Sequence, residues 1–140
     1  SAVLAKSRGL PHEVLRITES VQERAAALLG LPVSHMEPPQ LVCYSPGEFY
    51  APHVDWGKPE DVSLWLSGQR VATVLVYLND VAPDSGGATR FPQLGLQVLP
   101  ERGAALAWPN VSSRGEPLPE TEHEAQPLLG GELAESGWDA

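Results

Sequence analysis

Residues 70–78 read RVATVLVYL and give the clearest indication of the fold. After Arg70 the segment is apolar at almost every position and is rich in valine, a β-branched residue that favours strands. A short, nearly continuous apolar run is typical of a strand that is covered on both faces of its sheet. We therefore expect a buried β-strand here.

Other short apolar segments surround this one and are separated by Gly, Pro, Asn and Asp. They read QLVCYS (40–45), EFYAPHVD (48–55), GATRF (87–91), LQVLP (96–100), AALAW (104–108), TEHEAQPLL (121–129) and ELAESGW (132–138). About eight short strands at close spacing indicate a sandwich or barrel, and this number suits a jelly roll. The predicted fold is therefore mainly β.

The first third of the chain has a helical pattern instead. Pro11 suits a first helical turn, and Gly30 and Pro32 end the pattern, so a helix is predicted over about residues 11–29. The apolar side chains that recur along it, and that we expect to pack, are Val14, Ile17, Val21, Ala25 and Leu28. We expect one domain over residues 1–140, with this helix packed outside a β core of about residues 39–138.

Composition excludes several classes of partner. The chain has 140 residues and a formal net charge of −9, which argues against binding to nucleic acid or to an anionic membrane surface. No run of about 18 apolar residues exists, so no membrane span is expected. The single cysteine, Cys43, excludes an internal disulfide and a cysteine-rich zinc site. The long segment 56–70, which carries Trp65 and Leu66, is interpreted as a lid or substrate loop.

The triplet His-Val-Asp at 53–55 is the first candidate for chemistry. On a strand, residues two apart point to the same face, so His53 and Asp55 would present an imidazole and a carboxylate together. With a second histidine they would form the two-histidine, one-carboxylate triad of non-haem Fe(II) sites. Taken alone, the triplet favours a hydrogen-bonded structural histidine, because such triplets are frequent by chance. His12 and His35 fall in the helix and in a loop, where surface or capping roles are expected.

Several blocks of the sequence resemble the prolyl 4-hydroxylase catalytic domain, within the Fe(II)- and 2-oxoglutarate-dependent dioxygenases. They are RAAALLGLPVSHMEPPQLVCYSPGEFYAPHVDW (24–56), GQRVATVLVYLNDV (68–81), GGATRFP (86–92) and LPERGAALAW (99–108), in the order and at about the spacing of the family. The resemblance covers about residues 20–131 and implies a double-stranded β-helix. It also implies that His123, followed by Pro127 and Gly131, is the missing histidine ligand.

The same resemblance implies the reaction and its cofactors. Fe(II) would be held by His53, Asp55 and His123, with 2-oxoglutarate and O₂ as cosubstrates and ascorbate as reductant. The product would be a hydroxylated prolyl residue of a peptide or protein. Tyr44 and Thr89 would bind 2-oxoglutarate. The peptide groove would be lined by Tyr50, Arg70 and Trp138.

One position departs from the family. Ten residues after the distal histidine the family has a lysine that pairs with the C5 carboxylate of 2-oxoglutarate, and here that residue is Leu133. No Lys or Arg follows Arg114, so a small shift in register cannot supply the charge. Arg90 could substitute, but strand alternation should turn it away from the face that Thr89 occupies.

Two classes of function therefore follow from the sequence. The first is an active 2-oxoglutarate-dependent prolyl hydroxylase. The second is a weak or inactive relative that binds proline-rich peptides. The sequence determines neither the oligomeric state nor the compartment, although the resemblance would suit the secretory pathway or the endoplasmic reticulum lumen. The triplet Asn-Val-Ser at 110–112 is a glycosylation acceptor pattern that fits such a route, but such triplets are frequent by chance.

Overall fold

A computed structural model describes residues 12–58, 60–61, 64 and 67–129 of the chain. It forms two compact units, residues 1–44 and 45–140. The expectation of one domain over residues 1–140 stays a prediction. Within the described residues, no helix combines the length and the apolar composition that crossing a bilayer requires.

The first unit consists of the helix α1 (His12–Leu29) and the short 3-10 helix η1 (Val33–His35). The helix ends where the sequence predicted, because Gly30 adopts a left-handed φ of 66° that other residues rarely adopt. The amide of Leu31 then donates to the carbonyl of Ala26 over 3.0 Å, and the amide of Gly30 donates to Ala27. This pair of hydrogen bonds is the Schellman motif, which satisfies the last carbonyls of a helix.

The prediction that the apolar stripe of this helix packs is wrong for its large side chains. Of the predicted stripe only Ala25 is buried, whereas the large members are between 36% and 65% exposed, namely Val14, Ile17, Val21 and Leu28. The less exposed face instead includes Thr18, Gln22 and Ala26. On this face the amide of Gln22 donates to the carbonyl of Glu37, in the segment that follows η1, over 3.1 Å.

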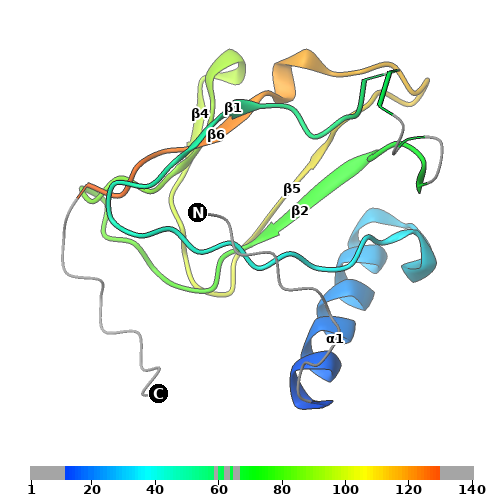
Figure 1. The fold of residues 1–140 in the computed structure, drawn as a ribbon, viewed down its shortest axis with the longest axis horizontal. Helices are drawn as coiled ribbons and strands as arrows, with labels where there is room; N and C mark the ends of the chain where they lie inside the picture. Colours follow the sequence, from blue (N-terminus) through cyan, green and yellow to red (C-terminus); the bar gives the residue numbers. More distant parts are fainter. Residues whose placement is uncertain (1–11, 59, 62–63, 65–66, 130–140) are drawn as a thin grey trace. The chain divides into compact units, whose positions relative to one another are not determined.

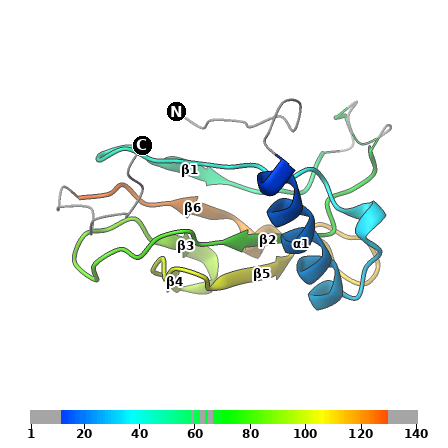
Figure 2. The same ribbon diagram turned by 90° about the horizontal axis from the view of Figure 1, so that it is seen from below.

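The second unit contains two antiparallel sheets, which are separate layers in Figure 1 and overlap in the view from below in Figure 2. The larger sheet has the order β1-β6-β3-β4, with strands β1 (Tyr50–His53), β6 (His123–Ala125), β3 (Thr89–Phe91) and β4 (Leu96–Val98). The smaller sheet pairs β2 (Ala72–Val76) with β5 (Ala105–Pro109). Two further 3-10 helices connect these strands, η2 (Pro92–Leu94) and η3 (Pro119–Thr121).

Six of the predicted strands are confirmed by β1 to β6. The segment RVATVLVYL provides β2, which runs in register against β5, but all five residues of β2 are half-buried, so the expected burial on both faces is wrong. The predicted strand at 40–45 is wrong, because this segment has no strand pairing in the described structure and Leu41 and Val42 are exposed. The predicted strand at 132–138 lies outside the described residues.

Aromatic side chains fill the space between the two sheets. Phe91 from β3 and Trp108 from β5 are both buried, and their rings meet edge to face with centroids 5.3 Å apart. Such pairs stabilise a core beyond the area that they bury. Trp108 also contacts the ring of His123 on β6, with centroids 4.7 Å apart. The core of the second unit therefore continues directly into the histidine predicted as a ligand.

Gln69 joins the two ends of the long segment between β1 and β2. Its carboxamide oxygen accepts a hydrogen bond from the amide of Gly57 over 2.8 Å, and its nitrogen donates to the carbonyl of Gly57 over 3.0 Å. Both hydrogen-bonding groups of the side chain are thus used to hold the chain immediately after Asp55. Trp65 and Leu66 lie outside the described residues, so the lid interpretation stays a prediction.

Gly86 offers a test of the packing between the start of β3 and the end of β6. It has a φ of 72°, and a Cβ added to it would stand 2.3 Å from the carbonyl oxygen of Pro127. Gly95 has a similar φ of 65° with open space around it, which makes it a matched control. A left-handed conformation costs an L-residue about 1–2 kcal/mol at either position, and only Gly86→Ala adds a clash with backbone.

We expect Gly86→Ala to lower the free energy of unfolding by about 1–3 kcal/mol more than Gly95→Ala does, since overpacking typically costs this much. Urea denaturation of both variants measures the difference. Equal losses in the two variants would show that the contact with Pro127 relaxes without cost.

Candidate metal centre and cosubstrate site

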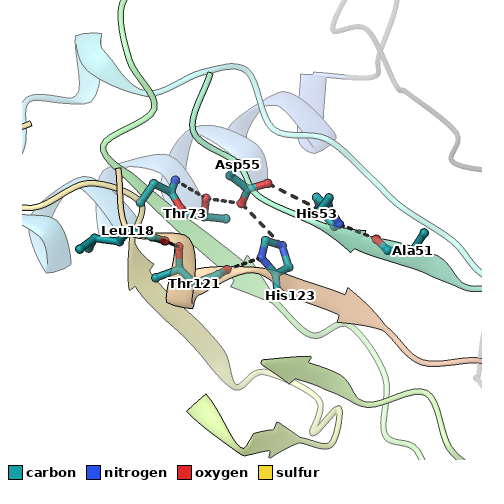
Figure 3. A network of polar contacts seen from close by, with 8 residues as sticks. Ala51, His53, Asp55, Thr73, Leu118, Thr121 and His123 are labelled. Atoms are coloured by element: carbon teal, nitrogen blue, oxygen red, sulfur yellow. Dashed lines mark hydrogen bonds and ion pairs between the residues drawn. The ribbon is translucent and has the colours of Figure 1, made fainter. Parts of the chain in front are cut away.

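His53, Asp55 and His123 come together although the sequence separates the last from the other two. His53 ends β1, His123 begins β6, and the two residues are directly paired in the antiparallel register. One ligand atom from each of the three side chains lies within 4.8 Å of the others. Figure 3 shows both imidazoles and the carboxylate directed toward one another.

Backbone hydrogen bonds leave the same nitrogen available on each histidine. The Nδ1 atom of His53 lies 2.9 Å from the carbonyl of Ala51, and that of His123 lies 3.0 Å from the carbonyl of Thr121. A carbonyl can only accept, so Nδ1 carries a proton in both rings, and Nε2 is the nitrogen that a neutral ring offers as a metal ligand. Outer-shell bonds of this kind fix the tautomer and the orientation of metal-binding histidines.

The two Nε2 atoms face the carboxylate without bonding to it. Each lies 3.7 Å from an oxygen of Asp55, His53 from Oδ1 and His123 from Oδ2. This separation exceeds the range of a hydrogen bond. Burial, more than any other influence, holds the pKa of His53 below its usual value, and the nearby His123 lowers it further. His53 is therefore neutral at neutral pH, which is the form that binds a metal.

The chemistry of these donors fits Fe(II). Two neutral imidazole nitrogens and one carboxylate oxygen on one side of an ion form the facial triad of non-haem Fe(II) oxygenases, which leaves positions for substrates. The geometry differs in one detail from the prediction. Asp55 lies beyond the end of β1, and the pairing of β1 with β6 is irregular between Tyr50 and His53. The carboxylate thus reaches the cluster from a bend and not from a regular strand.

Comparison with known proteins assigns the family. Residues 39–138 match the model of the 2OG-Fe(II) oxygenase superfamily. The chain belongs to this superfamily. The match covers all six strands and all three residues of the cluster.

Relatives of this oxygenase chain include subunits of prolyl 4-hydroxylases. It is 36% identical over 131 residues to prolyl 4-hydroxylase subunit alpha-1 of Gallus gallus, covering 91% of this chain and 25% of that protein. The human subunit alpha-1 is 35% identical over 131 residues, with 91% and 24% covered. The chain therefore spans about a quarter of the length of these curated relatives.

A solved structure supports the jelly-roll fold of this oxygenase. The viral collagen prolyl hydroxylase of Paramecium Bursaria Chlorella virus-1, in a complex with 2OG, superposes with a TM-score of 0.69 at 26% identity. The superposition covers 87% of this chain and 70% of that one. The prediction of a mainly β, jelly-roll fold is confirmed.

Thr89 and Tyr50 both belong to the second unit, and Thr89 lies on β3, which pairs with the strand of His123. Thr89 is buried on β3, and its Oγ1 accepts a hydrogen bond of 2.9 Å from the hydroxyl of Tyr77. Burial raises the pKa of Tyr77, so this hydroxyl keeps its proton. Tyr50 is 45% exposed, and its ring lies 4.1 Å, centroid to centroid, from that of His53. Thr89 thus faces the interior, and Tyr50 gives the cluster an accessible aromatic border.

The other residues predicted for the site lie in several parts of the chain. Tyr44 is the last residue of the first unit, so its role stays a prediction. Arg70 is exposed just before β2. Trp138 and Leu133 lie outside the described residues. Arg90 is exposed, as the alternation along β3 predicted, and its guanidinium pairs with Glu124 over 3.1 Å.

Sequence reasoning missed two polar residues next to the cluster. Thr73 on β2 donates a hydrogen bond to Asp55, and Asn110, just after β5, donates one to Thr73. Asn110 has 0% of its surface exposed, so the glycosylation pattern at this position is not accessible in the folded unit. The signal for Thr73 was present, since it is a hydroxyl within an otherwise apolar strand.

Proposed function

We propose that this chain is a prolyl 4-hydroxylase-type dioxygenase, which hydroxylates prolyl residues of peptides or proteins with Fe(II), 2-oxoglutarate and O₂. The observation that carries the proposal is the convergence of His53, Asp55 and His123 with both Nε2 atoms available. The relatedness to prolyl 4-hydroxylase subunits supports this choice among the reactions of the superfamily. Ascorbate is proposed as the reductant.

In this proposal each group of side chains has one task. His53, Asp55 and His123 hold Fe(II), which with 2-oxoglutarate and O₂ supplies the oxidation of an unactivated C–H bond. Thr89 hydrogen-bonds 2-oxoglutarate, with Tyr77 directing its hydroxyl proton to Thr89. The same task is proposed for Tyr44 from the resemblance to the family alone. The apolar rings of Phe91 and Trp108 keep water away from the His123 side of the cluster. By resemblance to the family, the side chains proposed to contact the peptide are Tyr50, Arg70 and Trp138.

The position of Tyr50 supports a role in binding a prolyl residue. A pyrrolidine ring packs well on an aromatic face, and the partly exposed ring of Tyr50, tilted by 51° against the ring of His53, places such a face next to the three candidate ligands. The alternative of a peptide-binding module without turnover is not favoured, because the donors and their supporting hydrogen bonds are all present in the described residues.

The direct test is turnover by the purified protein with Fe(II), ascorbate, 2-oxoglutarate and a proline-rich peptide. We expect succinate in proportion to hydroxylated peptide, detected as a mass increase of one oxygen atom. A matched peptide with alanine in place of proline serves as the control and should yield no hydroxylated product. Succinate without peptide oxidation would keep the oxygenase chemistry and reject the prolyl substrate. Peptide binding without succinate would favour the binding module.

Leu133 leads to a prediction about cosubstrate affinity. Without the lysine of the family, 2-oxoglutarate would be held by the metal and by neutral hydrogen bonds, which contribute only about 0.5–1.5 kcal/mol each. We expect Leu133→Lys to lower the Michaelis constant for 2-oxoglutarate by roughly tenfold or more, equivalent to about 1.4 kcal/mol. The measurement is succinate formation as a function of 2-oxoglutarate concentration.

Leu129→Lys is a suitable control, because it adds the same charge at a side chain that is 62% exposed and should leave the constant unchanged. A tight Michaelis constant in the parent, with no gain in Leu133→Lys, would show that another group already anchors the C5 carboxylate. Arg90 is a poor candidate for that group because Glu124 already engages it. The hydroxyls of Tyr77 and Thr89 would then be examined first.

A further inference from the structure

Asp55 is held by a chain of hydrogen bonds that comes from the opposite sheet. The hydroxyl of Thr73 on β2 lies 2.6 Å from Oδ2 of Asp55, and Nδ2 of Asn110 lies 2.9 Å from that hydroxyl. Figure 3 shows Thr73 beside the carboxylate, on the side away from Ala51. No described residue makes a hydrogen bond to Oδ1 of Asp55, which leaves the two carboxylate oxygens in different surroundings.

The direction of these hydrogen bonds is fixed by the number of protons. A threonine hydroxyl has one proton, and Nδ2 of Asn110 can only donate, so the proton of Thr73 must point to Asp55. If the amide of Asn110 were turned over, its oxygen would attract that proton. The hydroxyl oxygen of Thr73 and Oδ2 of Asp55 would then face each other with lone pairs only, without a proton between them, at a distance of 2.6 Å. The arrangement with Nδ2 as donor is therefore the stable one.

Burying Asn110 at this place costs free energy. It is 0% exposed, and among the described residues its Oδ1 has no hydrogen-bond partner. A buried acceptor without a partner costs about 1–3 kcal/mol. Such a residue is expected where its other polar group has a task that an apolar side chain could not perform. Here that other group is the Nδ2 donor that directs Thr73.

We propose that Thr73 and Asn110 are positioning residues that make Asp55 bind the metal through a single oxygen. The hydroxyl occupies Oδ2, so Oδ1 is the better ligand and chelation by both oxygens is disfavoured. A single bond from Asp55 keeps the remaining positions of the metal open for cosubstrates, which a triad of this kind requires. This inference rests on the proposed metal site at His53, Asp55 and His123.

The experiment uses Co(II) with the full chain, without 2-oxoglutarate or peptide, so that its readouts do not depend on turnover. Calorimetry gives the affinity, and the visible absorption of Co(II) reports the number of ligands. We expect Thr73→Val, which keeps the shape and removes the hydroxyl, to bind Co(II) about tenfold more weakly, as is typical when an outer-shell partner is lost. Its absorption spectrum should also change.

Thr73→Ser is the matched control, because it keeps the hydroxyl and should retain both the affinity and the spectrum of the parent. Thr73→Ala also lacks the hydroxyl and has a smaller side chain. It replaces Thr73→Val in the measurement if circular dichroism shows that Thr73→Val does not fold. Asn110→Ala tests the second step, since Thr73 keeps its hydroxyl but loses the group that directs it. We expect an intermediate loss of affinity in that variant.

Unchanged affinity and spectrum in Thr73→Val would overturn the inference, as would an equal loss in Thr73→Ser, which would point to packing. If the parent binds Co(II) and Thr73→Val binds it with the same affinity and spectrum, this inference is overturned but the proposed metal site is not. A parent that binds no Co(II) overturns the proposed metal site, and this inference with it.

Discussion

His123→Ala is expected to lower the affinity for Mn(II) or Co(II) by at least about 100-fold, more than is typical for the loss of an outer-shell partner. The variant removes one of three ligand atoms that lie within 4.8 Å of one another, and the two that remain cannot hold an ion on three sides. Oxidation of 2-oxoglutarate should be lost with the metal. Calorimetry with an oxygen-stable ion measures the first effect, and succinate formation the second.

His35→Ala is the control for this prediction. His35 belongs to η1 and to no group of three potential ligands in the described part of the chain, so its loss should leave metal affinity unchanged. His53→Ala should behave as His123→Ala does. Full metal affinity in either of these two variants would refute the assignment of the triad.

Trp108→Ala should cause the largest loss of stability, about 3–5 kcal/mol, which is the usual cost of removing a buried tryptophan. The side chain is 8% exposed, and its ring contacts those of Phe91 and His123. Its removal would leave a void between the two sheets. Denaturation in guanidinium chloride, with and without Co(II), measures the loss and shows whether the metal restores part of it by binding the folded state.

Trp108→Phe separates the role of the ring from that of the indole nitrogen. In the described structure Nε1 of Trp108 is buried without a hydrogen-bond partner, so a phenylalanine gives up no hydrogen bond there. It also keeps an aromatic face against Phe91 and His123. We expect Trp108→Phe to cost clearly less than Trp108→Ala. A loss below about 1 kcal/mol in Trp108→Ala would contradict the central position of this side chain in the core.

The strands and the candidate ligands could be predicted because they leave local or family-specific patterns. The apolar run of β2 and the short segments that follow it predicted a mainly β fold, which the structure confirms. The His-Val-Asp triplet predicted two donors on one side of the chain. The third donor, His123, came from the resemblance alone, since nothing in the sequence shows that β6 pairs with β1.

The rest could not be predicted because it depends on contacts between distant elements. Thr73 reaches Asp55 from another sheet, and Asn110 comes from a third place in the chain, so no spacing in the sequence relates them. The helix shows the same limit. Its apolar residues lie on more than one face. The hydrogen bond from Gln22 to Glu37 is made on the less exposed face, which is not the face that the periodicity predicted.

The burial of Asn110 has a consequence for the biosynthesis of the protein. The triplet Asn-Val-Ser would be accessible to an oligosaccharide-transferring enzyme only while the chain is unfolded, because in the folded unit the acceptor nitrogen donates to Thr73 and the residue has no exposed surface. A sugar attached there could not be accommodated between β5 and Asp55. In a compartment that glycosylates nascent chains, folding and modification would therefore compete, and a glycan on Asn110 would mark molecules that can no longer assemble the metal centre.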